Sequence, residues 1–257
     1  MSPILFEIKD AIAFITFNRP VKLNAFNREM ALMLQEKLHE CRSNEIRCVL
    51  ITGAGKAFSA GQDLAEVTDP GGQGMQRILS EHYNPIVSRI RKLAKPVVAA
   101  VNGVAAGAGA NIALCCDIVV AAESASFIQA FSKIGLIPDS GGTFMLPRLI
   151  GWQKASALMM LGEKVAAPEA ERIGMIYKIF KDDVFLENAI NIARFLADMP
   201  TKGLAFTKQA LNMSFTSNFD EQLNDEDILQ QKAAATKDYR EGVTAFMEKR
   251  KPGFTGE

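Results

Sequence analysis

Residues 96–111 read PVVAAVNGVAAGAGAN. The apolar run Pro96–Val101 predicts a strand that is covered on both faces. The glycine- and alanine-rich stretch Gly103–Gly109 leads from this strand into a predicted helix at Ala110–Cys116. Because the first N–H groups of a helix have no partner within it, this junction could hold an anion, or it could simply pack closely against a neighbouring strand.

Further strands and helices lie on both sides of this run. Ile4–Lys9 and Ile12–Phe17 predict a hairpin, and Arg47–Thr52 and Ile118–Ala122 predict buried strands. After residue 184 the pattern is helical, over Phe185–Met199, Thr201–Ser214, Asn218–Ala234 and Thr236–Lys249. The sequence therefore predicts an α/β core over residues 1–184 and a helical region over residues 185–257, which packs on the core or on another subunit.

The composition excludes several classes of protein. The 257 residues carry 29 basic and 29 acidic side chains, a balance that argues against a protein built to coat nucleic acid. The four cysteines form no CxxC pair and there are two histidines, so we expect neither a disulfide framework nor a metal site. The N-terminus lacks a signal-peptide pattern, and polar residues and glycines interrupt the longest apolar stretch. We therefore expect no membrane partner and a cytoplasmic location.

Two glycine-containing segments are candidate ligand sites. In Phe58–Leu64 (FSAGQDL) small residues follow a predicted buried strand, so a ligand could approach the backbone closely, or the segment could be a tight turn. Gly107 and Gly109 begin a spacing like that of dinucleotide-binding proteins, but Ile112 stands where the third glycine belongs. This mismatch argues against a NAD-dependent oxidoreductase.

Asp139 is a candidate catalytic side chain. It lies in the segment GLIPDSGGT, residues 135–143, among apolar residues that include Phe131, Phe144 and Met145. Apolar surroundings raise the pKa of a carboxyl group toward the range that suits a general base. Asp139 also precedes a predicted helix over Ser140–Ile150 and could be its N-cap. The residues leave both roles open.

A charged helix is predicted near the C-terminus, over Asp238–Lys251. Its alternating charges are typical of a solvated face. The basic cluster Lys249–Lys251 lies near Phe246, and together they could instead hold an anionic aromatic group such as a nucleotide. A non-catalytic scaffold or RNA-binding module would need a longer basic stripe than this one.

Taken together, five ordered segments resemble the crotonase (enoyl-CoA hydratase/isomerase) superfamily. They are Asn18–Ala25, Phe58–Leu64, Ala99–Gly109, Phe127–Gly142 and Arg240–Lys251. The resemblance spans nearly the whole chain. It implies an α/β spiral of repeated ββα units with a C-terminal helical trimerisation region, assembled as a homotrimer or as a dimer of trimers.

The resemblance also implies where an acyl-CoA thioester binds, with no cofactor besides the CoA of the substrate. The family polarises the thioester carbonyl with two backbone N–H groups, which match Gln62 and Ala108 here. Family members usually have glycine at the second position, but only its amide is used. The implied contacts of the substrate are Lys22, Ala60, Gly61, Asp63, Leu64, Gly109, Phe131, Phe246 and Lys249, the last two from this or a neighbouring subunit.

Departures from the family pattern bear on the reaction. Hydratases of the family activate water with two glutamates, and Asn111 and Phe131 stand at those positions. Asp139 matches an acid of isomerase members, and Ile134–Thr143 is most similar to the phenylacetate-degradation branch. This implies an acyl-CoA isomerase that shifts a 3-enoyl double bond to the 2-position, or that converts 2-(1,2-epoxy-1,2-dihydrophenyl)acetyl-CoA to the oxepin thioester. Enoyl-CoA hydratase is the alternative, and the segment from Asp69 to Gly74 is a candidate wall of the acyl pocket.

Overall fold

The computed structural model describes residues 2–68 and 74–257. Residues 69–73 of the candidate acyl-pocket wall lie outside the described residues. The strands are β1 (Ile4–Lys9), β2 (Ile12–Phe17), β3 (Cys48–Gly53), β4 (Ala57–Ser59), β5 (Val97–Val101), β6 (Val104–Ala106), β7 (Ile118–Ala122), β8 (Ser126–Ile128), β9 (Lys164–Ala166) and β10 (Lys178–Phe180). The α-helices are α1 (Arg28–Glu40), α2 (Leu64–Val67), α3 (Gly74–Arg77), α4 (Asn84–Lys92), α5 (Ala108–Leu114), α6 (Gly142–Ile150), α7 (Trp152–Leu161), α8 (Ala167–Arg172), α9 (Phe185–Asp198), α10 (Thr201–Met213), α11 (Phe219–Ala234) and α12 (Lys237–Glu248). Two 3₁₀ segments, η1 (Pro20–Lys22) and η3 (Ala130–Ile134), and a π-helical segment, η2 (Ile78–Tyr83), complete the list.

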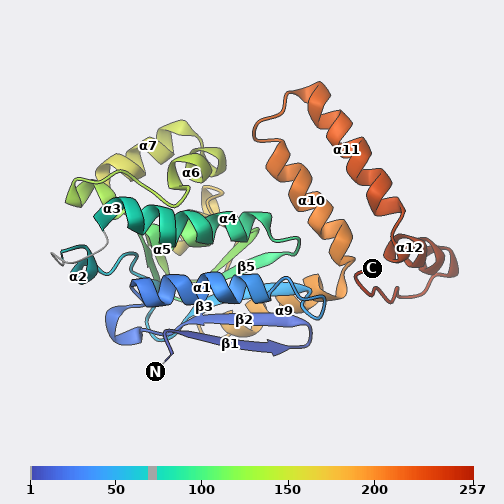
Figure 1. Cartoon of the computed structure of the whole chain (residues 1–257), viewed down its shortest axis with the longest axis horizontal. Coiled ribbons are helices and arrows are strands. Elements are labelled where there is room, and N and C mark those ends of the chain that lie inside the picture. Colours follow the sequence, from blue (N-terminus) through green and yellow to red (C-terminus); the bar gives the residue numbers. More distant parts are fainter. Residues whose placement is uncertain (1, 69–73) are drawn as a thin grey trace.

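The strands form two sheets. The larger has the order β1-β2-β3-β5-β7-β10, and only its first pair is antiparallel. The smaller has the order β4-β6-β8-β9, and only its last pair is antiparallel. Helices α1 and α4 cover one side of the larger sheet, and α9 lies on the other (Figure 1).

The chain passes back and forth between the two sheets. Each of β3, β5 and β7 in the larger sheet is followed at once by β4, β6 or β8 in the smaller one, and then by helical segments. This arrangement confirms the expected spiral of ββα units. The second strand of each unit is three residues long, so it is too short to show strand periodicity in the sequence.

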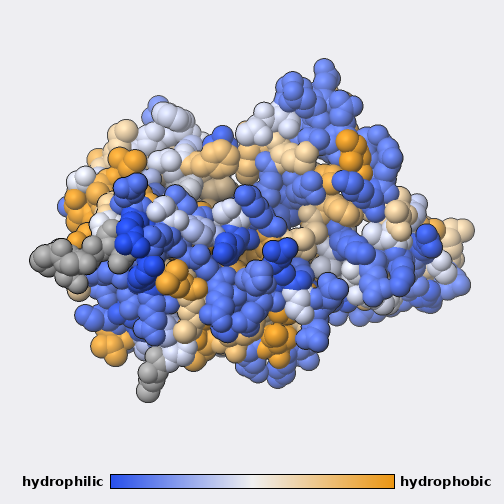
Figure 2. Space-filling view, in the orientation of Figure 1, coloured by the Kyte–Doolittle hydropathy of each residue, from blue (hydrophilic) through white to orange (hydrophobic). Residues whose placement is uncertain are grey.

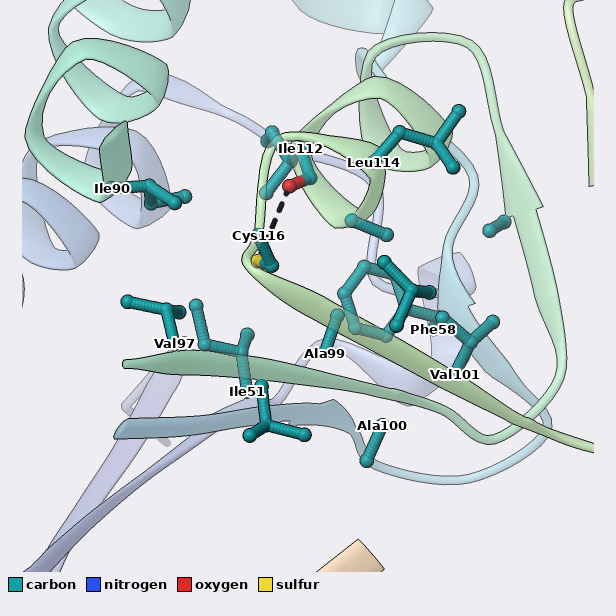
Figure 3. Close-up of a cluster of buried hydrophobic side chains, with 14 of the residues drawn as sticks. Ile51, Phe58, Ile90, Val97, Ala99, Ala100, Val101, Ile112, Leu114 and Cys116 are labelled. Carbon is teal, nitrogen blue, oxygen red and sulfur yellow. Dashed lines mark hydrogen bonds between the residues drawn. The ribbon is translucent and has the colours of Figure 1, made fainter. Parts of the chain in front are cut away.

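Helix α5 lies inside the molecule, because all of its residues are buried. The apolar cluster of Figure 3 contains Ile112 of α5, Phe58 of β4, and Ala99 and Val101 of β5. Alternate residues of β5 point to opposite faces of the sheet, and every one is buried because α5 and α9 cover the two faces. The prediction of a strand covered on both faces is confirmed.

The last three helices, α10–α12, form what we call the C-terminal arm. In Figures 1 and 2 an indentation separates this arm from the core. The base of the arm is fixed by Lys208 of α10, whose buried ammonium group donates to Asp117 and to the carbonyl oxygen of Ile90, each at 2.7 Å. Several large apolar side chains of the arm are exposed, namely Phe219, Leu223, Ile228, Phe246 and Met247.

The helical region begins at Phe185, as expected, but its first helix belongs to the core. Ala189 and Ala193 of α9 are fully buried against the larger sheet. The division of the chain at residue 184 and the trimer both remain predictions. Within residues 2–68 and 74–257, none of the helices has the length and apolar character needed to cross a bilayer.

Candidate active site

Three chain segments meet where the parallel strands of the smaller sheet end. Strand β4 leads into Ala60–Gln62, β6 leads into Gly107 and Ala108, and β8 leads into Gln129–Phe131. Neighbouring parallel strands deliver the segments after their carboxyl ends to the same edge of a sheet, which is where α/β proteins bind ligands. Three of the candidate segments of the sequence therefore come together at this edge.

The backbone N–H of Gln62 points away from its neighbouring strand. The Phe26 N–H donates to the carbonyl oxygen of Gly61 at 2.7 Å, and the Asp63 N–H donates to that of Phe26 at 2.9 Å. In a parallel bridge the residue between two such bonds directs its own N–H and C=O groups to the other side. Among the described residues, the Gln62 N–H has no hydrogen-bond acceptor.

The backbone N–H of Ala108 is the second free donor. Ala108 is the first residue of α5 and follows Gly107, which has φ 52° and ψ −128°. The first N–H groups of a helix have no acceptor within it, and the structure gives that of Ala108 none among the described residues. A Cβ atom added to Gly61 would lie 3.4 Å from the Ala108 nitrogen, so the two donor segments are in direct contact.

Gly109 allows this contact between segments. A Cβ atom at this position would lie 2.6 Å from the Cβ atom of Ser59 and 2.7 Å from its carbonyl oxygen. These distances are too short for any side chain, so α5 can approach the end of β4 only with glycine here. The packing of Gly109 explains the residue type at a position that the resemblance assigns to the substrate.

The side chain of Gln62 is clamped from two sides. The Tyr83 hydroxyl group donates to its Oε1 atom at 2.8 Å, and its Nε2 atom donates to Glu66 at 2.8 Å. Tyr83 ends the π-helical segment η2, a type of distortion that is common at functional sites. Burial raises the pKa of Tyr83, and the nearby negative charges of Asp139, Glu66 and Asp63 raise it further. Tyr83, Gln62 and Asp139 therefore share one electrostatic environment.

Asp139 is half-buried, and its carboxyl group does not cap a helix. Burial raises the pKa of this group, although the Ser140 hydroxyl group, which donates to Oδ1 at 2.8 Å, offsets part of the effect. Helix α6 begins at Gly142 after Gly141, with no side-chain cap. The N-cap alternative is therefore wrong, because Ser140 and Gly141 both adopt left-handed backbone angles that delay the helix.

The two positions that the resemblance matches to hydratase glutamates carry side chains without acid–base function, Asn111 and Phe131. Asn111 is fully buried, donates to the carbonyl oxygen of Asp139 at 2.8 Å and accepts from Gln129 at 2.8 Å. Phe131 is buried, and a Cβ atom added to Gly107 would lie 3.7 Å from its ring. The sequence did not indicate that Gln129 holds the Asn111 side chain, because this contact forms only in the folded chain.

The loop that carries Lys22 lies beside the Ala60–Leu64 segment. The Ala60 N–H donates to the carbonyl oxygen of Leu23 at 2.9 Å, and Arg19 forms an ion pair with Asp63 at 3.0 Å. The structure thus brings together Lys22, Ala60, Gly61, Asp63 and Leu64. The carboxylate of Asp63 is occupied by Arg19 and by the N–H of Ala65 at the start of α2, and its main-chain N–H and C=O groups are hydrogen-bonded to Phe26 and Glu66.

Phe246 and Lys249 are not brought to this edge within one chain. Phe246 lies on α12 and is 82% exposed, and Lys249 ends that helix in a left-handed conformation. Figure 1 shows α12 at the opposite end of the molecule from α2, which begins at Leu64. Within one chain, the structure therefore keeps these two residues away from the edge where the other candidates meet.

The described residues offer no cluster of three or more His, Cys, Asp or Glu side chains that could hold a metal ion. Cys41, Cys48, Cys115 and Cys116 are buried free thiols. The structure thus shows two main-chain N–H groups without an acceptor among the described residues, those of Gln62 and Ala108, and a half-buried carboxyl group at Asp139.

Comparisons with known proteins agree over the whole chain. Residues 7–257 match the family described as Enoyl-CoA hydratase/isomerase. The chain is 48% identical to the 1,2-epoxyphenylacetyl-CoA isomerase of Escherichia coli, with 100% of both chains covered. It is 43% identical to a protein of Rhodobacter capsulatus named "Probable enoyl-CoA hydratase", with 98% of each covered. It also superimposes on the crystal structure of an enoyl-CoA hydratase from Bacillus anthracis with a TM-score of 0.92, at 32% identity, covering 99% of this chain and 100% of that one. The chain therefore belongs to the enoyl-CoA hydratase/isomerase family of crotonase-fold enzymes.

Proposed function

We propose that the protein is an acyl-CoA isomerase in which Asp139 moves the proton and the N–H groups of Gln62 and Ala108 bind the thioester oxygen. The observation that carries the proposal is the half-buried carboxyl group of Asp139, because burial raises its pKa. The main-chain carbonyl oxygen of Asp139 is also hydrogen-bonded to Asn111 of helix α5. The same helix begins with Ala108. The full-length similarity to an epoxyphenylacetyl-CoA isomerase supports the substrate class.

In the proposed reaction, negative charge moves onto the thioester oxygen when a proton leaves the α-carbon. The two main-chain donors stabilise this charge, and the loss of one such donor typically costs about 100- to 1000-fold in rate. Asp139 takes the proton from C2 and returns it at C4, so the double bond moves from C3–C4 to C2–C3 and no water is consumed. With the epoxide thioester, the same polarisation assists opening and expansion of the ring.

Hydration is the alternative reaction, and the similarity to the Rhodobacter capsulatus protein favours it. Hydration needs a group that activates water. Asn111 and Phe131 cannot accept a proton from water, and both functional atoms of Asn111 are already hydrogen-bonded. Isomerisation requires one carboxyl group, and this chain supplies it.

The proposal includes the assembly of the protein. Phe246 and Lys249 of a neighbouring subunit would complete the CoA pocket, in a cytoplasmic homotrimer or dimer of trimers. The exposed apolar side chains of the C-terminal arm support an interface between subunits.

The test is a panel of 3-enoyl, 2-enoyl and aromatic epoxide CoA thioesters, assayed with the wild type and with Asp139→Asn. We expect the substitution to lower the isomerisation rate about 100- to 10000-fold, to a small residual rate, and to leave CoA affinity nearly unchanged. Asp198→Asn, which alters an exposed carboxylate of α9, is the matched control and should keep wild-type activity. Full isomerase activity of Asp139→Asn would refute the base assignment, and wild-type hydration of crotonyl-CoA at a comparable rate would favour the hydratase.

A further inference from the structure

We infer that Asn111 is a positioning residue that holds the Asp139 segment at a fixed place relative to the Ala108 amide. The inference rests on the proposed function, because it takes Asp139 as the base and Ala108 as an oxyanion donor. Asn111 touches neither the substrate nor the reacting atoms in this account. It acts through the main chain of Asp139.

The hydrogen bonds of Asn111 fix the orientation of its amide group. Its Nδ2 atom donates to the carbonyl oxygen of Asp139, and its Oδ1 atom accepts from Gln129 Nε2, both at 2.8 Å. Asn111 is fully buried and Gln129 nearly so, so water does not compete for these bonds. A carboxylate has no N–H to offer, so neither aspartate nor glutamate could make the bond to Asp139.

Helix α5 links the two parts of the site as a rigid body. Ala108, Asn111 and Cys115 are spaced at i, i+3 and i+7, so they share one face at this helix. The Cys115 thiol group donates to the carbonyl oxygen of Ser140 at 3.5 Å, which adds a second contact to the same loop. The oxyanion donor and the attachment of the base are therefore carried by two successive helical turns.

The loop that carries the base needs an external support. Ser140 has φ 52° and Gly141 has φ 78°, so two left-handed residues follow Asp139 directly. A non-glycine residue keeps such a conformation only where its surroundings impose it. A Cβ atom on Gly142 would lie 2.3 Å from Asn111 Nδ2, which shows how closely the loop is drawn onto this side chain. Without the Asn111 amide, the loop can relax and the carboxyl group moves.

The experiment compares Asn111→Ala in the wild-type and Asp139→Asn backgrounds. In the wild-type background we expect kcat for the isomerisation to fall about 10- to 100-fold with KM nearly unchanged, because a displacement of about 1 Å can cost about 100-fold. In the Asp139→Asn background the same change should have no further effect on the residual rate, since the residue has nothing left to position.

Asn102→Ala is the matched control. Asn102 also links two loops through both ends of its amide, donating to Gly55 at 3.0 Å and accepting from Gly53 at 3.1 Å. It precedes β6, at the end of that strand away from Ala108, so its loss should lower stability and leave kcat within about twofold. If Asn111→Ala does not fold, Gln129→Met removes the bond that orients Asn111 and should lower kcat in the same way.

The outcomes separate this inference from the proposed function. Wild-type kcat in both Asn111→Ala and Gln129→Met, with Asp139→Asn inactive, would overturn the inference and leave the isomerase intact. Equal losses from Asn111→Ala in the two backgrounds would overturn it as well, because they would show an effect independent of Asp139. Full activity of Asp139→Asn would refute the proposed function itself.

Discussion

In the proposed mechanism, the carboxyl group of Asp139 links activity to stability. Burial raises its pKa, so the folded protein binds its proton more tightly than the unfolded chain does. The unfolded group titrates at about pH 3.9. As pH rises from there through the raised folded pKa, the folded state is the one that binds more protons, and its stability falls across this window.

Asp139→Asn should therefore be more stable than the wild type at neutral pH while being inactive. Its advantage should shrink as pH falls toward about 4, because the wild-type carboxyl group is then protonated. Urea unfolding at several pH values measures the difference, with Asp198→Asn as the exposed reference. A variant that is less stable at pH 7 would show that Asp139 makes a favourable charged contact.

In the wild type, kcat should rise with pH, and the apparent pKa of this rise should lie above the ordinary aspartate value.

Tyr83→Phe should weaken the clamp on Gln62. The substitution removes the hydroxyl group that donates to Gln62 Oε1 and leaves a half-buried acceptor without this partner, at a cost of about 1 kcal/mol in the free energy of unfolding. We expect a lower kcat with an unchanged KM, because the main-chain donor loses part of its support. Steady-state kinetics and denaturant unfolding test this, with Tyr177→Phe, at a 67% exposed position, as the control. Unchanged kcat would show that the pairing with Phe26 suffices to hold the donor.

The close packing of helix α5 against the end of β4 depends on Gly109 and can be tested. In Gly109→Ala the new Cβ atom would overlap Ser59, so we expect destabilisation of about 1–3 kcal/mol and a loss of activity as the donor segments separate. Gly203→Ala in α10 is the matched control. A Cβ atom there would lie 3.5 Å from Pro200, an ordinary contact, and higher helix propensity should leave stability equal or up to about 1 kcal/mol greater. Thermal unfolding of both variants would show whether the effect is specific to α5.

Elements with a full period were predictable from the sequence. The hairpin strands and Ile118–Ala122 have the predicted bounds, because each is five or six residues long and consists mostly of β-branched and apolar residues. The three-residue strands of the smaller sheet were not predictable, because they are too short to show a pattern and pair with segments that are distant in the sequence. Helix α6 begins two residues after the predicted start because Ser140 and Gly141 are left-handed, which depends on contacts with α5.

The candidate site was predictable to a similar extent. Residues next to one another in the chain, such as Ala60–Leu64, could be identified by their segment. The tether from Gln129 through Asn111 to the main chain of Asp139 could not, because it joins groups from three separate segments. Phe246 and Lys249 lie beyond what one chain can test, since α12 is remote from the edge where the other residues meet.

The assembly of the whole molecule can be tested by mixing inactive chains. If a neighbour supplies Phe246 and Lys249, chains with Asp139→Asn and chains with Phe246→Ala and Lys249→Ala should restore part of the activity when they are unfolded and refolded together. A mixed oligomer then contains sites with an intact base from one chain and an intact pocket wall from the next. Light scattering gives the oligomeric state, and native mass spectrometry confirms that mixed species form. Mixed oligomers without recovered activity would contradict the shared site.

The passage of the chain between two sheets has a consequence for how such a protein can change over generations. The proposed amide donors follow β4 and β6, whereas the proposed base, Asp139, lies after β8. A main-chain N–H group remains when the side chain of its residue changes. Mutations in the segment after β8 can therefore replace one acid–base side chain by another and leave the two amide donors in place. Substitutions within one segment can then change the reaction that is catalysed, which agrees with the isomerase and hydratase names found among the relatives of this chain.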